Sequence, residues 1–178
     1  MARAAPLAHV GHLARRFFGS LAPGGPPAAE TGWVECHLRA GEVAVWRSMS
    51  GPDRRHADGV ARRVETALGP LAARPVLAAA LLHDAGKVES GLGPFGRAVA
   101  TVSAGVVGRE RAQGWSTGRG FARRVGLYLR HPEIGGALLE SAGSDPLTIA
   151  WTRQHHLPAE RWTVPRTIGD ALKAADDD

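Results

Sequence analysis

The sequence predicts an all-α protein: a single compact helical domain preceded by a short N-terminal appendage. From Gly41 onward, apolar residues recur at steps of three and four, the period of an amphipathic helix. No segment shows the sustained apolar–polar alternation of a half-buried strand. Pro75, Pro146 and Pro165 stand where the first turn of a helix accepts proline.

The first 40 residues are expected to form a basic arm. Residues 7–18 have roughly helical apolar spacing in a stretch without acidic residues, and the Pro/Gly run 23–27 is typical of a linker. We therefore assign residues 1–40 to the arm and residues 41–178 to the domain.

The domain is expected to contain eight helices. Asp53 is a suitable N-cap for the second of them, and Gly69 with Pro70 ends it. The polar stretch 108–120 is expected to be a loop. The predicted helices span residues 41–49, 53–69, 74–88, 94–107, 119–130, 132–142, 145–156 and 165–177.

Composition excludes several classes of protein. The 178 residues are 44% hydrophobic and 22% charged, which is ordinary for a globular chain and excludes wholesale disorder. One cysteine excludes an intrachain disulfide scaffold. No apolar run approaches the roughly 20 residues of a membrane span, and no secretory segment is recognisable. We therefore expect a cytoplasmic protein. Its formal net charge of +5 suits anionic partners.

Histidine and aspartate recur on the apolar faces of five expected helices. His56 precedes Val60 and Val64 in i+4 register, and the nearly apolar helix from residue 74 ends in His83-Asp84. His131 begins an apolar stripe, His155 follows Trp151, and Asp176 follows Leu172, again in i+4 register. An inward aspartate needs a counter-charge or a metal. Imidazole and carboxylate together suit zinc, manganese, iron or cobalt, with magnesium a further choice. We therefore expect one or two divalent metal ions.

The order of these residues resembles the HD superfamily of metal-dependent phosphohydrolases. Residues 79–87, Ala-Ala-Leu-Leu-His-Asp-Ala-Gly-Lys, are similar to the core motif of that family, Leu-Leu-His-Asp-x-Gly-Lys. The string that starts at His131 and the pair His155-His156 resemble the subset with a second metal. The resemblance covers residues 53–178 and implies an all-helical hydrolase of phosphoester or phosphoanhydride bonds.

Carried over by position, the resemblance implies the ligands of two metal ions. Asp84 would bridge the two ions, and His156 is an alternative to His155, ranked lower because it lies on a less apolar face. Asp177 and Asp178 rank below Asp176 on helical register. The implied ligands are His56, His83, Asp84 and Asp176 for the first ion, and Asp84, His131 and His155 for the second.

Three basic residues are expected to bind the substrate, a small phosphorylated compound of nucleotide-like type. Lys87, one of only two lysines, lies three residues after Asp84, so we expect it to clamp a phosphate and act with Asp84 in catalysis. Arg54 and Arg55 flank His56 and are expected to assist. The Gly-Tyr-Pro element of the cyclic-di-GMP phosphodiesterase branch is absent, which argues against that activity. The alternative is a non-catalytic module that binds nucleic acid or a protein through its basic surface.

Overall fold

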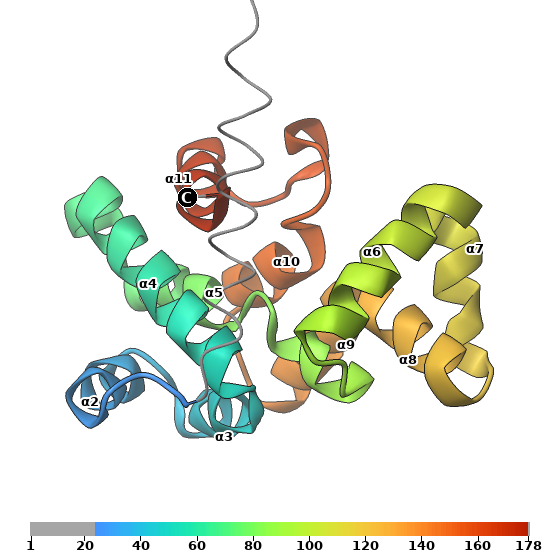
Figure 1. Ribbon diagram of the computed structural model, residues 1–178. Helices are drawn as coiled ribbons and strands as arrows, with labels where there is room; N and C mark the ends of the chain where they lie inside the picture. Colours follow the sequence, from blue (N-terminus) through green and yellow to red (C-terminus); the bar gives the residue numbers. More distant parts are fainter. Residues whose placement is uncertain (1–23, 178) are drawn as a thin grey trace, which may run out of the picture.

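The structure, a computed structural model, describes residues 24–177, and the prediction of an all-α fold is confirmed. Every regular element in this range is a helix. Helix α5 (Arg74–Leu82) lies at the centre, with all residues from Val76 to Leu82 buried. Helices α4 (Gly51–Leu68) and α10 (Pro146–Gln154) pack against it (Figure 1). Helix α11 (Arg166–Asp177) covers α4, and α9 (His131–Ser141) covers α10.

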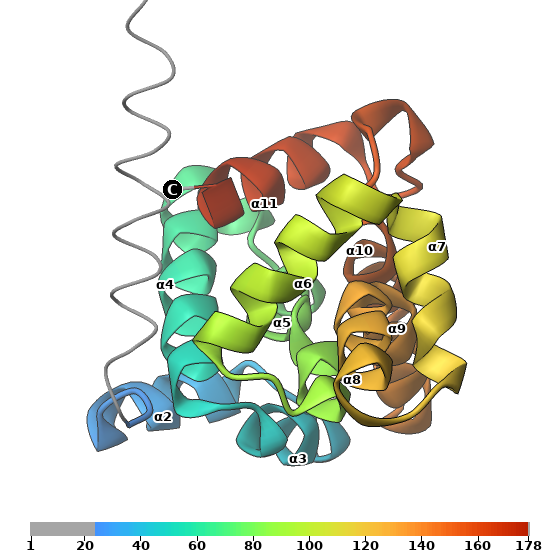
Figure 2. The same ribbon diagram turned by 45° about the vertical axis from the view of Figure 1, so that its right-hand side comes forward.

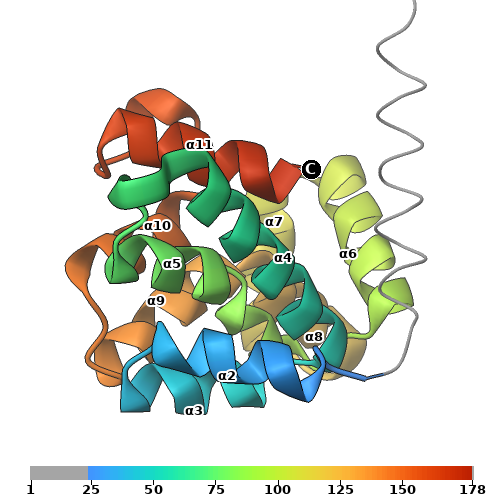
Figure 3. The same ribbon diagram turned by 90° about the vertical axis from the view of Figure 1, so that its left-hand side faces the viewer.

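The main core extends further toward the N-terminus than the expected domain boundary. Helices α2 (Ala28–Cys36) and α3 (Ala40–Ser48) lie side by side at one end of the fold (Figure 3). Val34 of α2 and Trp46 of α3 are fully buried and belong to the same apolar cluster as α5. The sequence did not predict α2, and its residues were assigned to the arm. Residues 7–18 lie outside the described range.

A second, smaller apolar cluster joins α6 (Pro94–Val107), α7 (Arg109–Gly114) and α8 (Gly120–Leu129). Leu92, Ala112 and Leu129 are among its buried members. In Figure 2, α6 crosses the front of the molecule, between α11 and α8. The outer face of α6 is exposed and apolar, with Val102 at 66% and Val106 at 79% exposure.

Three local predictions are wrong. The helix predicted over 74–88 ends at Leu82, and a 3₁₀ helix, η2 (Ala85–Ser90), follows it. The loop expected over 108–120 contains α7 and a further 3₁₀ turn. The N-cap of α4 is Ser50, whose hydroxyl accepts a hydrogen bond from the backbone N–H of Asp53. The other predicted helices are present, with ends shifted by at most two residues. Among residues 24–177, no helix combines the length and the apolar character needed to cross a membrane.

Candidate metal centre

Three helices present a histidine at their C-terminal ends. His83 and His155 are the C-caps of α5 and α10, and His131 comes two residues after the end of α8. Each Nδ1 lies within hydrogen-bond distance of the carbonyl oxygen three residues earlier: 2.9 Å for His83, 2.7 Å for His131 and 2.9 Å for His155. Because a carbonyl only accepts, Nδ1 carries the proton. In its neutral form, each ring then offers its Nε2 lone pair as a ligand.

Asp84 lies among these imidazoles. Its Oδ2 is 3.5 Å from Nε2 of His83. Its Oδ1 is 3.3 Å from Nε2 of His131 and 3.8 Å from Nε2 of His155. The Asp84 side chain is only 5% exposed. Its two oxygens thus face different histidines, which is the arrangement that a bridging carboxylate requires.

The first group of candidate ligands comprises His56, His83 and Asp176. Nε2 of His56 is 3.0 Å, and Nε2 of His83 is 3.5 Å, from Oδ1 of Asp176. The ligand atoms of the group lie within 4.8 Å of one another. Helical register placed Asp176 inward as expected, whereas the neighbouring Asp177 pairs with Lys173 at 2.7 Å.

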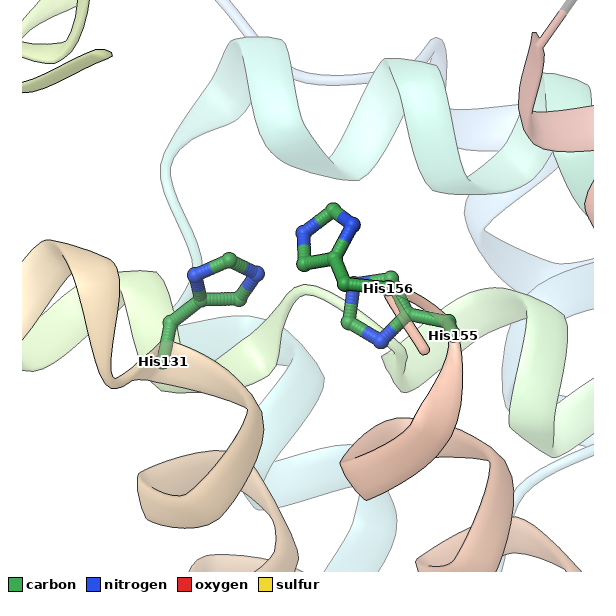
Figure 4. A group of neighbouring side chains, drawn as sticks. All are labelled: His131, His155 and His156. Carbon is green, nitrogen blue, oxygen red and sulfur yellow. The ribbon is translucent and has the colours of Figure 1, made fainter. Parts of the chain in front are cut away.

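The second group comprises His131, His155 and His156, whose ligand atoms also lie within 4.8 Å of one another. Figure 4 shows the three rings gathered at the start of α9 and the end of α10. The ring of His131 is 5.4 Å from that of His155 and 5.1 Å from that of His156, measured between centroids. The sequence ranked His156 below His155, but the structure brings both within reach of His131.

The carboxylates of the centre are held ionised by their neighbours. Burial raises the pKa of Asp84, but the nearby charges of Lys87 and His83 outweigh it and hold this pKa well below its usual range. Burial also raises the pKa of Asp176, but the charge of His83 and the hydrogen bond with His56 outweigh it and lower this pKa. In turn, burial lowers the pKa of His83, but Asp84 and Asp176 outweigh it and raise this pKa to about 10. Between these carboxylates and without a cation, His83 is an imidazolium at neutral pH, and a metal ion that binds its Nε2 must displace that proton.

The histidines of the second group are held neutral. Burial is the main cause that lowers the pKa of His131 and His155. His156 is itself an exposed residue, but desolvation of its ring beside the buried histidines also lowers its pKa. Neutral imidazoles and ionised carboxylates are the protonation states that bind metal ions.

The donor set fits a divalent cation. The Nε2 atoms of His83, His131 and His155 are buried and make no hydrogen bond within residues 24–177. A buried polar atom left in this state costs about 1–3 kcal/mol, so three at one place require an explanation. A cation that accepts their lone pairs removes this cost. Mixed imidazole and carboxylate donors suit zinc, manganese, iron or cobalt.

The three basic residues expected to bind substrate occupy different surroundings. Lys87 forms an ion pair with Oδ2 of Asp84 and is 15% exposed. Its ammonium therefore lies at the candidate centre, where it contacts the carboxylate of Asp84. The guanidinium of Arg54 lies over the indole of Trp46, 5.2 Å from the ring centroid, which gives Arg54 a packing contact. Arg55 is partly buried. Phosphate contacts for Arg54 and Arg55 stay predictions.

A cavity of about 300 Å³ adjoins the second group. The sequence pattern did not indicate Arg109, which lines this cavity, because an isolated arginine in a polar stretch has no distinctive spacing. The helix break at Gly108, whose φ is +89°, ends α6 and starts α7 at this cavity. The lining residues are Thr101, Ala104, Arg109, Tyr128, Leu129, His131 and His156.

Comparisons with protein-family models, with curated proteins and with solved structures give no match to this chain.

Proposed function

We propose that the chain is a cytoplasmic, metal-dependent phosphohydrolase of the HD type that cleaves a small phosphorylated, nucleotide-like compound. One observation carries the proposal: three buried Nε2 atoms, on rings that are each oriented by an Nδ1 hydrogen bond, surround the carboxylate of Asp84. The order of these residues in the sequence and their resemblance to the HD motif support the same conclusion.

The two groups divide the ligands between two ions. The first group and one oxygen of Asp84 would hold one ion; the second group and the other oxygen would hold the other. When bound, such ions supply Lewis-acid chemistry, which neutralises phosphoryl oxygens and makes water nucleophilic near neutral pH. The chain itself orients the ligands through the Nδ1 hydrogen bonds and keeps the carboxylates ionised.

Lys87 adds a positive charge at the same place. Its pKa is lowered by burial but raised overall by the carboxylate of Asp84, so the side chain is an ammonium at neutral pH. A group that pairs with Asp84 in the absence of substrate is close enough to the ligands to turn toward a bound phosphoryl group. We therefore retain Lys87 as the phosphate clamp and Asp84 as the residue that couples the two ions.

The test combines metal analysis with a panel of phosphoesters. We expect about two transition-metal ions per chain and hydrolysis of at least one member of the panel. His131→Ala should lower the stoichiometry to about one. His37→Ala is the matched control, since Nδ1 of His37 also lies near a backbone carbonyl, at 2.8 Å from Trp33, but outside both groups. Absence of metal and of activity would refute the proposal and favour the non-catalytic module with a basic surface.

A further inference from the structure

The cavity beside the second group runs from the candidate metal ligands to the surface. His131, one of its lining residues, is 3% exposed, whereas Arg109, another, is an exposed residue. The buried imidazole therefore lies at the inner end and the guanidinium at the rim. Thr101 and Tyr128 line the space as well, so both polar and aromatic surface is available to a ligand.

The charge of Arg109 is not neutralised by a carboxylate. No acidic side chain of residues 24–177 forms an ion pair with it. Within the described part of the chain, its guanidinium donates one hydrogen bond, from Nη2 to the carbonyl oxygen of Leu129 at 3.3 Å, and Gln113 donates to the same oxygen at 3.2 Å. This contact ties α7 to the end of α8. It leaves most of the five N–H donors of the guanidinium available to a ligand.

The cavity is larger than the volume that a single phosphoryl group would occupy. A water molecule occupies about 30 Å³ in the liquid, so 300 Å³ accommodates a small organic molecule. Under the proposed function, the bound metal ions and Lys87 would supply the positive charge that binds a phosphoryl group. Lys87 does not line this cavity, and Arg109 does. A planar guanidinium at the rim matches a carboxylate or a second phosphate with two parallel hydrogen bonds.

We propose that Arg109 binds a second anionic group of the substrate, so that the preferred substrate is a small phosphorylated compound with a further carboxylate or phosphate. This inference rests on the proposed function, because it assumes that the phosphoryl group occupies the metal centre. It makes Arg109 a residue that determines specificity among phosphorylated compounds.

The test measures binding of phosphonates, which are not hydrolysed, to manganese-loaded protein by calorimetry. Carboxyalkylphosphonates with one to four methylene groups are compared with alkylphosphonates of the same length. Arg109→Gln removes the charge. Arg111→Gln is the matched control, because Arg111 is an exposed arginine of the same helix that does not line the cavity. Circular dichroism and metal content establish that each variant is folded and loaded.

At one chain length we expect the carboxylate form to bind about 10- to 100-fold more tightly, the range of a charge-assisted hydrogen bond. The Arg109 variant should lose this preference and keep its affinity for the alkylphosphonate, whereas the Arg111 variant should keep both. Absence of a preference at every length, or its persistence in the Arg109 variant, would overturn the inference. An equal loss of affinity for both ligand series would also overturn it, because Arg109 would then bind the phosphoryl group. Because binding needs no turnover, failure to hydrolyse any phosphoester would refute the proposed function separately.

Discussion

A single methyl group added at Gly86 should separate two elements of the candidate metal centre. Gly86 lies in η2, which packs directly against α9. An alanine Cβ at this position would overlap the carbonyl oxygen of His131 and lie 2.5 Å from the backbone nitrogen of Gly135. Both obstacles are backbone atoms, which cannot rotate away as a side chain can. Ordinary contact begins at 3.4 Å, so the two elements must move apart by more than an ångström to relieve the closer of these contacts.

We therefore expect Gly86→Ala to lower the free energy of unfolding by about 3 kcal/mol, the upper end of the usual cost of overpacking. The displaced backbone carries His131, so manganese affinity should also fall, by about 10- to 100-fold, as when a supporting contact of a metal ligand is lost. Urea denaturation measures the first quantity, and metal titration measures the second.

Gly105→Ala is the control for this prediction. Gly105 is an exposed residue of α6, and no described atom lies within 4 Å of its added Cβ. Alanine there should stabilise the protein by roughly 0.5–1 kcal/mol, because it restricts the unfolded chain and favours the helix. The close contact between η2 and α9 would be wrong if the free energy of unfolding of Gly86→Ala lay within about 0.5 kcal/mol of the wild-type value and its manganese affinity were unchanged.

Three further predictions concern Lys87, the Asp53–Arg97 pair and the metal itself. Lys87→Ala should retain its metal but hydrolyse p-nitrophenyl phosphate roughly 100- to 1000-fold more slowly, with partial rescue by arginine; a wild-type rate would show that Lys87 only supports Asp84. Asp53 accepts two hydrogen bonds from Arg97, at 2.5 and 2.7 Å, and although burial raises the pKa of Asp53, Arg97 outweighs it and lowers this pKa. Asp53→Asn should therefore cost about 3 kcal/mol of unfolding free energy at neutral pH. This difference in unfolding free energy from the wild type should shrink only as the pH falls below about 4 and through the lowered pKa. Urea unfolding at several pH values measures it, and a difference that stayed constant down to low pH would contradict the prediction. Manganese at 100 times its dissociation constant should add about 2.7 kcal/mol of stability and raise the melting temperature of chelator-treated protein by about 5–10 °C, so a melting curve insensitive to manganese would count against a structural metal.

Helical register predicted which side chains meet, because it depends only on the period of the helix. His56 and Asp176 follow or precede buried apolar residues at i+4 steps, and they meet at 3.0 Å although 120 positions separate them. Register does not show where a helix ends when neighbouring elements decide it. Residues 83–88 continue a helical pattern, yet the chain leaves the α-helix at Leu82 so that Gly86 can approach α9.

The errors at residues 28–40 and 108–120 have a related cause. Helices α2 and α7 each bury a single residue, Val34 and Ala112 respectively. A helix that buries so little has no apolar stripe for the sequence to display. Its formation depends on tertiary contacts and on turn geometry, such as the positive φ of Gly108. The cavity residue Arg109 was missed for this reason, since it follows that glycine.

The way in which the helices end explains why histidine suits this centre. The last carbonyls of a helix have no partner within it, and a histidine just beyond can donate its Nδ1 proton to one of them. For the carbonyl of Tyr128 the usual N–H donor would come from residue 132, which is a proline without that hydrogen. Each such hydrogen bond satisfies a carbonyl and orients a ring in one step. In the neutral ring it leaves the Nε2 lone pair as the ligand, beside the negative end of the helix dipole, which favours a cation. Helices α5, α8 and α10 all end in this way at Asp84. The local rules of helix termination and the donor set that a metal ion would require thus select the same residues.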